Sequence, residues 1–107
     1  MKRLESKQPK DNFLLAVDFP GAAGIVTITW VQVTTTREQS LPDLLTGVRP
    51  LVDDAAQIVL SALASADTAL LRIANGTSRQ IYHIEVLASD NNGGVWDEDL
   101  ILPVEEI

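Results

Sequence analysis

Cysteine is absent from this chain, which excludes a disulfide framework and any thiolate-bound metal site. Aromatic residues are few, so aliphatic side chains must build most of the core. No run approaches the roughly 20 apolar residues that cross a membrane, and no apolar segment follows the basic start. We therefore expect no membrane contact and no secretory signal.

Lysine and arginine are missing from Glu85 onward, where seven acids lie, and the net charge of the chain is −7. An acidic domain repels phosphates, so nucleic-acid binding is not expected. The basic residues of the start, Lys2, Arg3, Lys7 and Lys10, form either a solvated tail or a contact to an acidic partner surface. With 107 residues available for one core, we predict a flexible basic arm over 1–11 and one domain over 12–107.

Apolar residues alternate with polar ones in the last third of the chain, which predicts β-strands with one buried face. The alternation is clearest from Ile81 to Ala88, and a further strand runs to Val104. Asn75-Gly76 and Asn92-Gly93-Gly94 supply the positive φ angles that tight turns need. Together with the earlier runs, this spacing predicts an all-β protein, an immunoglobulin-like antiparallel β-sandwich of about seven strands.

The first half of the chain contributes less regular signals. We predict a strand from Phe13 to Phe19 and a second from Ile25 to about Val33, with a bulge or a change of sheet near Trp30. Thr34 to Ser40 reads as a polar loop. A loose turn over 41–47 and a short edge strand over 48–52 would follow.

Residues 53–64 fit two interpretations. Asp53 or Asp54 could cap a short alanine-rich helix. Alternatively, the alternation of Ile58, Leu60 and Ala62 describes a strand from Gln57 to Leu63, which we favour.

No constellation of residues supports catalysis. His83 is the only histidine, and no G-x-S-x-G nucleophile motif accompanies it. Asp97 and Asp99 lie on one face of a predicted strand and could offer oxygens to calcium, but the EF-hand spacing is missing. An acidic edge that deters aggregation or meets a basic neighbour is the better explanation. We assign no catalytic residue, cofactor, metal ligand or small-molecule substrate.

Three aromatic residues have predicted structural roles. Trp30 and Tyr82 are expected in the core, with the Tyr82 hydroxyl bonded to backbone as in the tyrosine corner of immunoglobulin-like sandwiches. Trp96, beside a glycine turn, serves either as an interface anchor or as a packing residue.

The chain also resembles a known family at both ends. Lys7-Gln8-Pro9-Lys10-Asp11 is similar to a K-x-P-x-[DE] segment that leads into a strand ending in Asp-Trp, here Asp18-Phe19. Trp30 matches a second-strand tryptophan, and Asn75-Gly76-Thr77 stands for a GGT turn ahead of Tyr82. Gly93 and Val104 follow at the family's spacing. These residues resemble the small immunoglobulin-like phage proteins described as fiber-tail adaptors.

The resemblance implies a non-catalytic virion structural protein, made in the bacterial cytoplasm, that links the tail or neck of a phage to fibres or spikes. Its partners would be other virion proteins, and it would act as an oligomer in the particle. The interface would use Lys2, Arg3, Lys7, Lys10, Trp96, Asp97 and Asp99. The fold would depend on Asp18, Trp30, Gly76, Tyr82, Gly93 and Val104. The alternative is a stand-alone module whose loops over 34–40 or 89–94 bind a carbohydrate or a protein.

Overall fold

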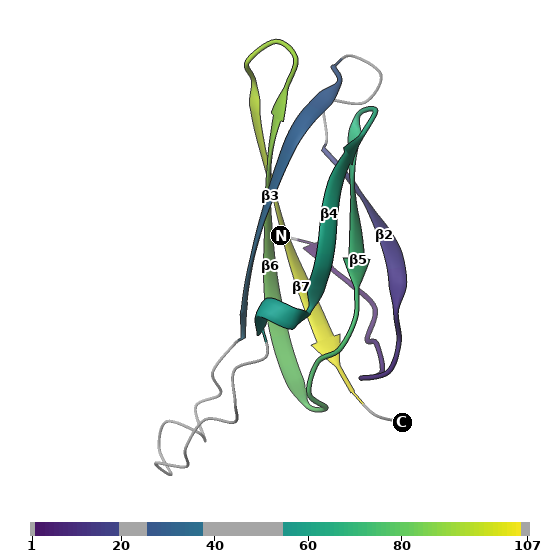
Figure 1. The fold of residues 1–107 in the computed structure, drawn as a ribbon. Helices are drawn as coiled ribbons and strands as arrows, with labels where there is room; N and C mark the ends of the chain where they lie inside the picture. The colour runs from purple at the N-terminus through teal and green to yellow at the C-terminus, as the bar shows by residue number, and fades with distance from the viewer. Residues whose placement is uncertain (1, 20–25, 38–54, 106–107) are drawn as a thin grey trace, which may run out of the picture.

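Seven strands and one short 3-10 turn make up the described structure, a computed structural model that covers residues 2–19, 26–37 and 55–105 (Figure 1). The elements are β1 (Lys2–Arg3), β2 (Phe13–Asp18), β3 (Ile28–Arg37), η1 (Ala55–Gln57), β4 (Val59–Ser65), β5 (Thr68–Ile73), β6 (Gln80–Asp90) and β7 (Val95–Val104). Within these residues no helix is long and apolar enough to cross a membrane.

The strands form two sheets that pack face to face, with the orders β1-β7-β6-β3 and β2-β5-β4. These orders match the G-F-C and B-E-D arrangements of the immunoglobulin fold, so the predicted sandwich of about seven strands is confirmed. One pairing departs from the antiparallel prediction. β1 runs parallel to β7 instead of joining β2, and the outer edge of β2 has no partner strand among the described residues.

The core lies between the two sheets and is built mainly from aliphatic side chains. From β6 come Tyr82, Ile84, Val86 and Ala88, each at most 1% exposed, as the alternation predicted. They pack with buried residues of the other strands and the flanking segments: Val17, Phe19, Ile28, Ala55, Ile58, Ala69, Leu71, Ile73, Leu100, Leu102 and Val104. Period-two spacing therefore decides which side chains enter the core.

A bulge in β3 changes the face that its side chains occupy. Ile28 is opposite Asp90 and Trp30 is opposite Ser89, so Thr29 is the extra residue, where a bulge was predicted. Ile28 is buried, whereas Trp30 is 50% exposed on the outer face. The prediction of Trp30 in the core was wrong, because the bulge reverses the alternation beyond it.

The prediction of a loop over 34–40 was also partly wrong. Thr34 to Arg37 continue β3 and pair with Glu85 to Tyr82 of β6. Threonine is β-branched and suits strands, and the long neighbouring strand β6 supplies hydrogen bonds to this segment. A polar sequence gives no local sign of that pairing. The remainder of that segment, the turn over 41–47, the edge strand over 48–52 and the caps Asp53 and Asp54 lie outside the described residues.

The ambiguous segment contains both a short helical turn and a strand. η1 covers Ala55–Gln57, and β4 follows it from Val59. The predicted strand is thus confirmed with its start moved by two residues. β4 pairs antiparallel with β5, and a bulge between Val59 and Ser61 leaves Leu60 exposed.

Candidate interaction surfaces

Three carboxylates converge on the outer face of the sheet β1-β7-β6-β3. Asp99 lies opposite Glu85 on β6, and Asp97 lies two residues before Asp99 on the same side of β7. One oxygen from each of the three lies within 4.8 Å of the others. We call Glu85, Asp97 and Asp99 the acidic cluster. The predicted convergence of Asp97 and Asp99 is present, and Glu85 was missed because only cross-strand register brings it there.

The acidic cluster is a local concentration of negative charge. Two like charges about 4 Å apart repel by about 1 kcal/mol in water, and salt screens this repulsion. Glu85 and Asp97 are exposed and Asp99 is half-buried, so water solvates most of these carboxylates. Within the described part of the chain, this is the group of carboxylates close enough to share a metal ion. A basic side chain of a partner would relieve the same repulsion.

An apolar rim borders the acidic cluster toward the β6–β7 turn. Trp30 and Val95 flank Ser89 on its two neighbouring strands, and Leu87 lies between Gln32 and Asp97. Val95 is 72% exposed and Trp30 is 50% exposed. The Trp30 ring, on β3, and the acidic cluster, on β6 and β7, lie on the same sheet face, so a partner could stack a cation on the ring and pair another with the carboxylates.

Trp96 has a structural role at the β6–β7 turn. Its indole N–H donates to Oδ2 of Asp90 at 2.9 Å, while the backbone N–H groups of Asn92 and Gly94 donate to Oδ1 at 2.7 and 2.9 Å. These bonds, that from Trp96 first, hold the pKa of the Asp90 carboxyl below its ordinary value. Trp96 is half-buried and packs against the core, so the packing interpretation describes it.

Lys7 is buried, with 3% of its surface exposed. Its ammonium donates to the carbonyl oxygens of Gln8 at 2.6 Å, of Pro9 at 3.3 Å and of Asn75. Desolvation lowers the pKa of Lys7, and Asp11 acts in the opposite direction. Lys7 therefore anchors the N-terminal segment to the β5–β6 turn, and its ammonium is not presented to a partner.

The rest of the segment predicted as a flexible arm lies along β7 in this structure. Leu4 N–H donates to Ile101 O at 2.8 Å, and Glu105 N–H donates to Lys7 O at 2.9 Å. Lys2 is opposite Leu100 in the ladder, and Arg3, opposite Ile101, is exposed beside the acidic cluster's sheet face. Two hydrogen bonds between Gln8 and Asp11 close the turn of the Lys7–Asp11 motif. Asp11 accepts from Gln8 N–H at 2.9 Å and returns a backbone bond to Gln8 O, which leaves Lys10 exposed on the turn.

The residues expected to determine the fold lie at the β5–β6 and β6–β7 turns and on the strands β2, β3, β6 and β7. Gly76 has φ +105°, and a Cβ there would lie 2.9 Å from a methyl of Val104, so only glycine fits. The Tyr82 hydroxyl accepts a hydrogen bond from Thr77 N–H at 2.8 Å, which is the predicted tyrosine corner. Gly93 has φ +83° at the other turn, whereas Asp18 is an exposed strand end.

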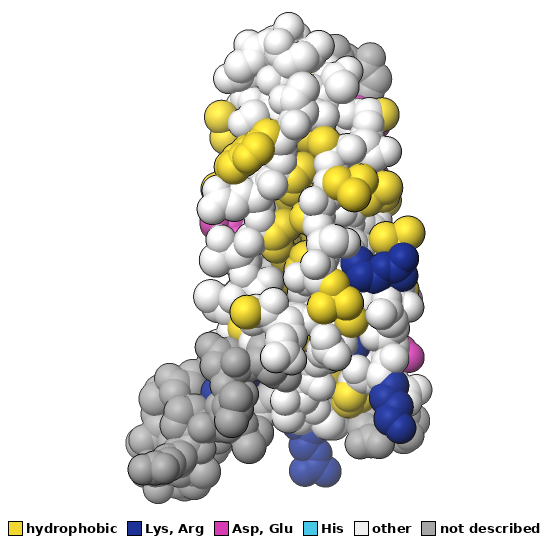
Figure 2. All heavy atoms as spheres, in the orientation of Figure 1, with side chains coloured by type: hydrophobic (Ala, Val, Ile, Leu, Met, Phe, Trp, Pro, Cys, Tyr) yellow, Lys and Arg dark blue, Asp and Glu magenta, His cyan; other side chains and the backbone are white. Residues whose placement is uncertain are grey.

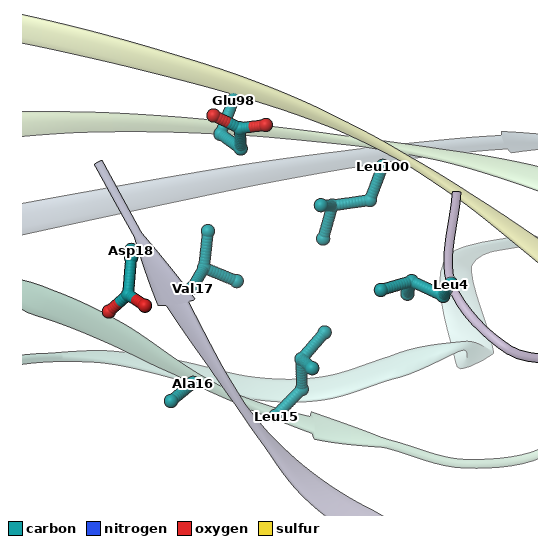
Figure 3. A pocket seen from close by; sticks show the side chains of 7 residues that line it. All are labelled: Leu4, Leu15, Ala16, Val17, Asp18, Glu98 and Leu100. Atoms are coloured by element: carbon teal, nitrogen blue, oxygen red, sulfur yellow. The ribbon is translucent and has the colours of Figure 1, made fainter. Parts of the chain in front are cut away.

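A narrow slot of about 150 Å³ lies between β2 and the β1–β7 edge (Figure 3). Leu4, Leu15, Val17 and Leu100 point into it, and Asp18 and Glu98 lie at one end. Sites for small molecules are typically about 300–1,000 Å³ and carry converging polar groups. The slot is smaller and apolar, and it brings together no nucleophile and base.

Together, the strand order and the tyrosine corner define an immunoglobulin-like β-sandwich. No family model matches the chain, and neither does any curated protein or solved structure.

Proposed function

We propose that this protein is a non-catalytic interaction domain whose acidic cluster binds a basic surface of a partner protein. Its setting would be a phage particle, as an adaptor between the tail or neck and the fibres or spikes. The acidic cluster carries this proposal, since it places like charges together on an exposed sheet face. The resemblance of the Lys7–Asp11 and Asn75–Val104 segments to fiber-tail adaptors supports the phage setting.

The geometry of the face supports protein binding in two further ways. Trp30 adds an exposed aromatic surface on the same sheet face, and tryptophan is enriched in interface hot spots. The outer side chains of β3, β6 and β7 lie on one sheet surface, so a partner could contact several strands at once. Charge complementarity of this kind accelerates association and makes it sensitive to salt.

The test uses purified protein and the tail, neck and fibre proteins encoded in the same phage genome. Binding is measured for the wild type and for a variant with Asp97→Lys and Asp99→Lys. We expect the wild type to bind one of these proteins with an affinity that falls as salt rises, and the variant to bind at least about tenfold more weakly. Mass spectrometry of purified particles would show whether the protein is part of the virion.

The matched control reverses two acids elsewhere. Glu5 and Glu105 are exposed and lie outside the acidic cluster, so Glu5→Lys with Glu105→Lys produces the same change in net charge. The proposal requires the control to keep partner binding. Equal loss in both variants would show a net-charge effect, and absence from purified particles would contradict the virion assignment.

A carbohydrate-binding module is the second candidate, and the exposure of Trp30 favours it. A half-exposed indole on the same strand and face as Gln32 and Thr34 offers a stacking surface and hydrogen-bond groups for a sugar. Titration with an array of glycans, read by tryptophan fluorescence, tests this candidate. A saturable change that Trp30→Ala removes would favour it over the adaptor role.

A further inference from the structure

The outer face of the sheet β2-β5-β4 is apolar at its centre. Leu14 on β2 is 58% exposed and Leu63 on β4 is 56% exposed, and the bulge of β4 adds Leu60 at 54%. Leu70 of β5 lies between Leu63 and Ala16 in the pairing register. In Figure 2 apolar side chains gather over β4 and toward β5, with a basic side chain beside them.

We call this surface the leucine face, and its outward side chains are Leu14, Ala16, Asp18, Leu60, Ser61, Leu63, Ser65, Thr68, Leu70 and Arg72. It differs from the outer face of the other sheet, which carries the acidic cluster. A soluble sandwich usually covers such strands with polar side chains, and a patch of exposed leucines indicates an interaction surface.

The register divides the leucine face into three rows across the strands. The middle row holds Ala16, Leu70 and Leu63. Arg72 lies in the row at one end, and Asp18 lies in the row at the other end. Arg72 donates to Asn12 Oδ1 at 3.1 Å, and no ion pair joins either charge to a residue in the described ranges.

This arrangement is self-complementary, and we propose that the leucine face binds a second copy of the chain through a two-fold axis that runs across the strands. Such an axis places β5 over β5 of the second copy and the middle row over its own counterpart. The end row with Arg72 then faces the end row with Asp18, twice by symmetry. Stacked sheets lie about 10 Å apart, a gap that leucines fill and a long arginine can bridge.

The charges favour this axis over a two-fold axis that runs along the strands. A two-fold axis along the strands would place the Arg72 row on itself and bring like charges together. Of these two axes, the one across the strands places the Arg72 row over the Asp18 row. The leucine face therefore has net charge zero within the interface, although the whole chain carries −7.

The size of the face sets the strength of the dimer. Ten outward side chains are a third to a half of the roughly 20–30 residues that a standard interface contributes from each partner. The dimer is therefore weak and forms at high concentration or at high local density in an assembly. The two acidic clusters remain on the outer faces of the dimer, which makes it bivalent toward basic partners.

Sedimentation equilibrium of the full chain, up to about 1 mM, tests the association directly. We expect a monomer–dimer equilibrium that Leu63→Asp weakens by at least about tenfold, because it places a carboxylate on the two-fold axis opposite its own copy. Val95→Asp is the control, since it adds the same charge to an exposed valine on the other sheet. A wild type that stays monomeric, or a Leu63→Asp variant that dimerises like the wild type, overturns the proposal.

Charge exchange tests the orientation and avoids a change in the leucines. Arg72→Glu and Asp18→Arg should each weaken the dimer, and the double variant should restore it because the pair is only inverted. Two single effects that add in the double variant overturn the Arg72–Asp18 contact.

The absence of cysteine allows a third measurement. Leu63→Cys lies opposite its own copy in the proposed dimer, so a short bis-maleimide should link two chains, whereas Val95→Cys should not link. Equal linking of both variants would contradict the proposed face. These readouts need no virion partner, so they can fail while the adaptor function stands, and the reverse also holds.

Discussion

The Tyr82 hydroxyl offers the most direct test of the fold. Tyr82 is fully buried, and its hydroxyl accepts a hydrogen bond from the backbone N–H of Thr77 at 2.8 Å. Tyr82→Phe keeps the ring and its packing and removes the hydroxyl, and with it this hydrogen bond. Removing one partner of a buried hydrogen bond costs about 1–3 kcal/mol.

Urea unfolding measures this loss. With a central loss of about 2 kcal/mol and an m-value of about 1.5 kcal/mol/M, the midpoint should fall by about 1.3 M at an unchanged m-value. Thr34→Val is the control, because it removes an exposed hydroxyl on β3 and should change stability by less than about 0.5 kcal/mol. A Tyr82→Phe variant as stable as the control would refute the structural role of the tyrosine corner.

The remaining predictions concern a turn glycine, a buried lysine and a buried carboxylate. Gly76→Ala should destabilise the protein more than Gly93→Ala, because both have positive φ but only Gly76 would bring a Cβ to 2.9 Å from Val104; thermal unfolding of the two variants compares them. Lys7→Met should lower the free energy of unfolding by about 1–3 kcal/mol, because the bonds to three carbonyls are lost. Hydrogen exchange should also increase in the N-terminal segment. Unchanged exchange there would contradict the role of Lys7 in anchoring this segment. Asp90 has a pKa lowered by folding, so its contribution is present above its unfolded pKa and disappears as the pH falls through the folded pKa. The stability difference between wild type and Asp90→Asn should therefore be constant above about pH 5 and shrink below about pH 4, and a pH-independent difference would count against this reasoning.

The backbone conformation at the two turns explains why these turns could be predicted from residue type. Asn75 and Gly76 both have positive φ, and Gly93 provides the same conformation at the second turn. Asn-Gly pairs are favoured where such angles are needed, so a local requirement is visible in the residue types themselves. The Lys7–Asp11 motif is different, because its lysine is fixed by carbonyls that include one from Asn75, far along the chain.

Local sequence was sufficient to predict the strands whose alternation matches one buried face, notably β6. It was also sufficient to predict the β5–β6 and β6–β7 turns. It also determined the all-β class, because seven such segments with little helical pattern leave few other arrangements. Each of these properties depends on residues close together in the chain, where side-chain period and turn conformation are direct consequences of residue type.

Contacts between distant segments set the exposure of Trp30, the continuation of β3 through Thr34 to Arg37 and the burial of Lys7. A one-residue bulge reverses the face of every later residue in a strand, and a polar strand is stabilised by its neighbour instead of by its own composition. Cross-strand register likewise brought Glu85 to Asp97 and Asp99 and placed Arg72 and Asp18 at opposite ends of the leucine face. These features depend on pairing between distant segments, and no local pattern specifies that pairing.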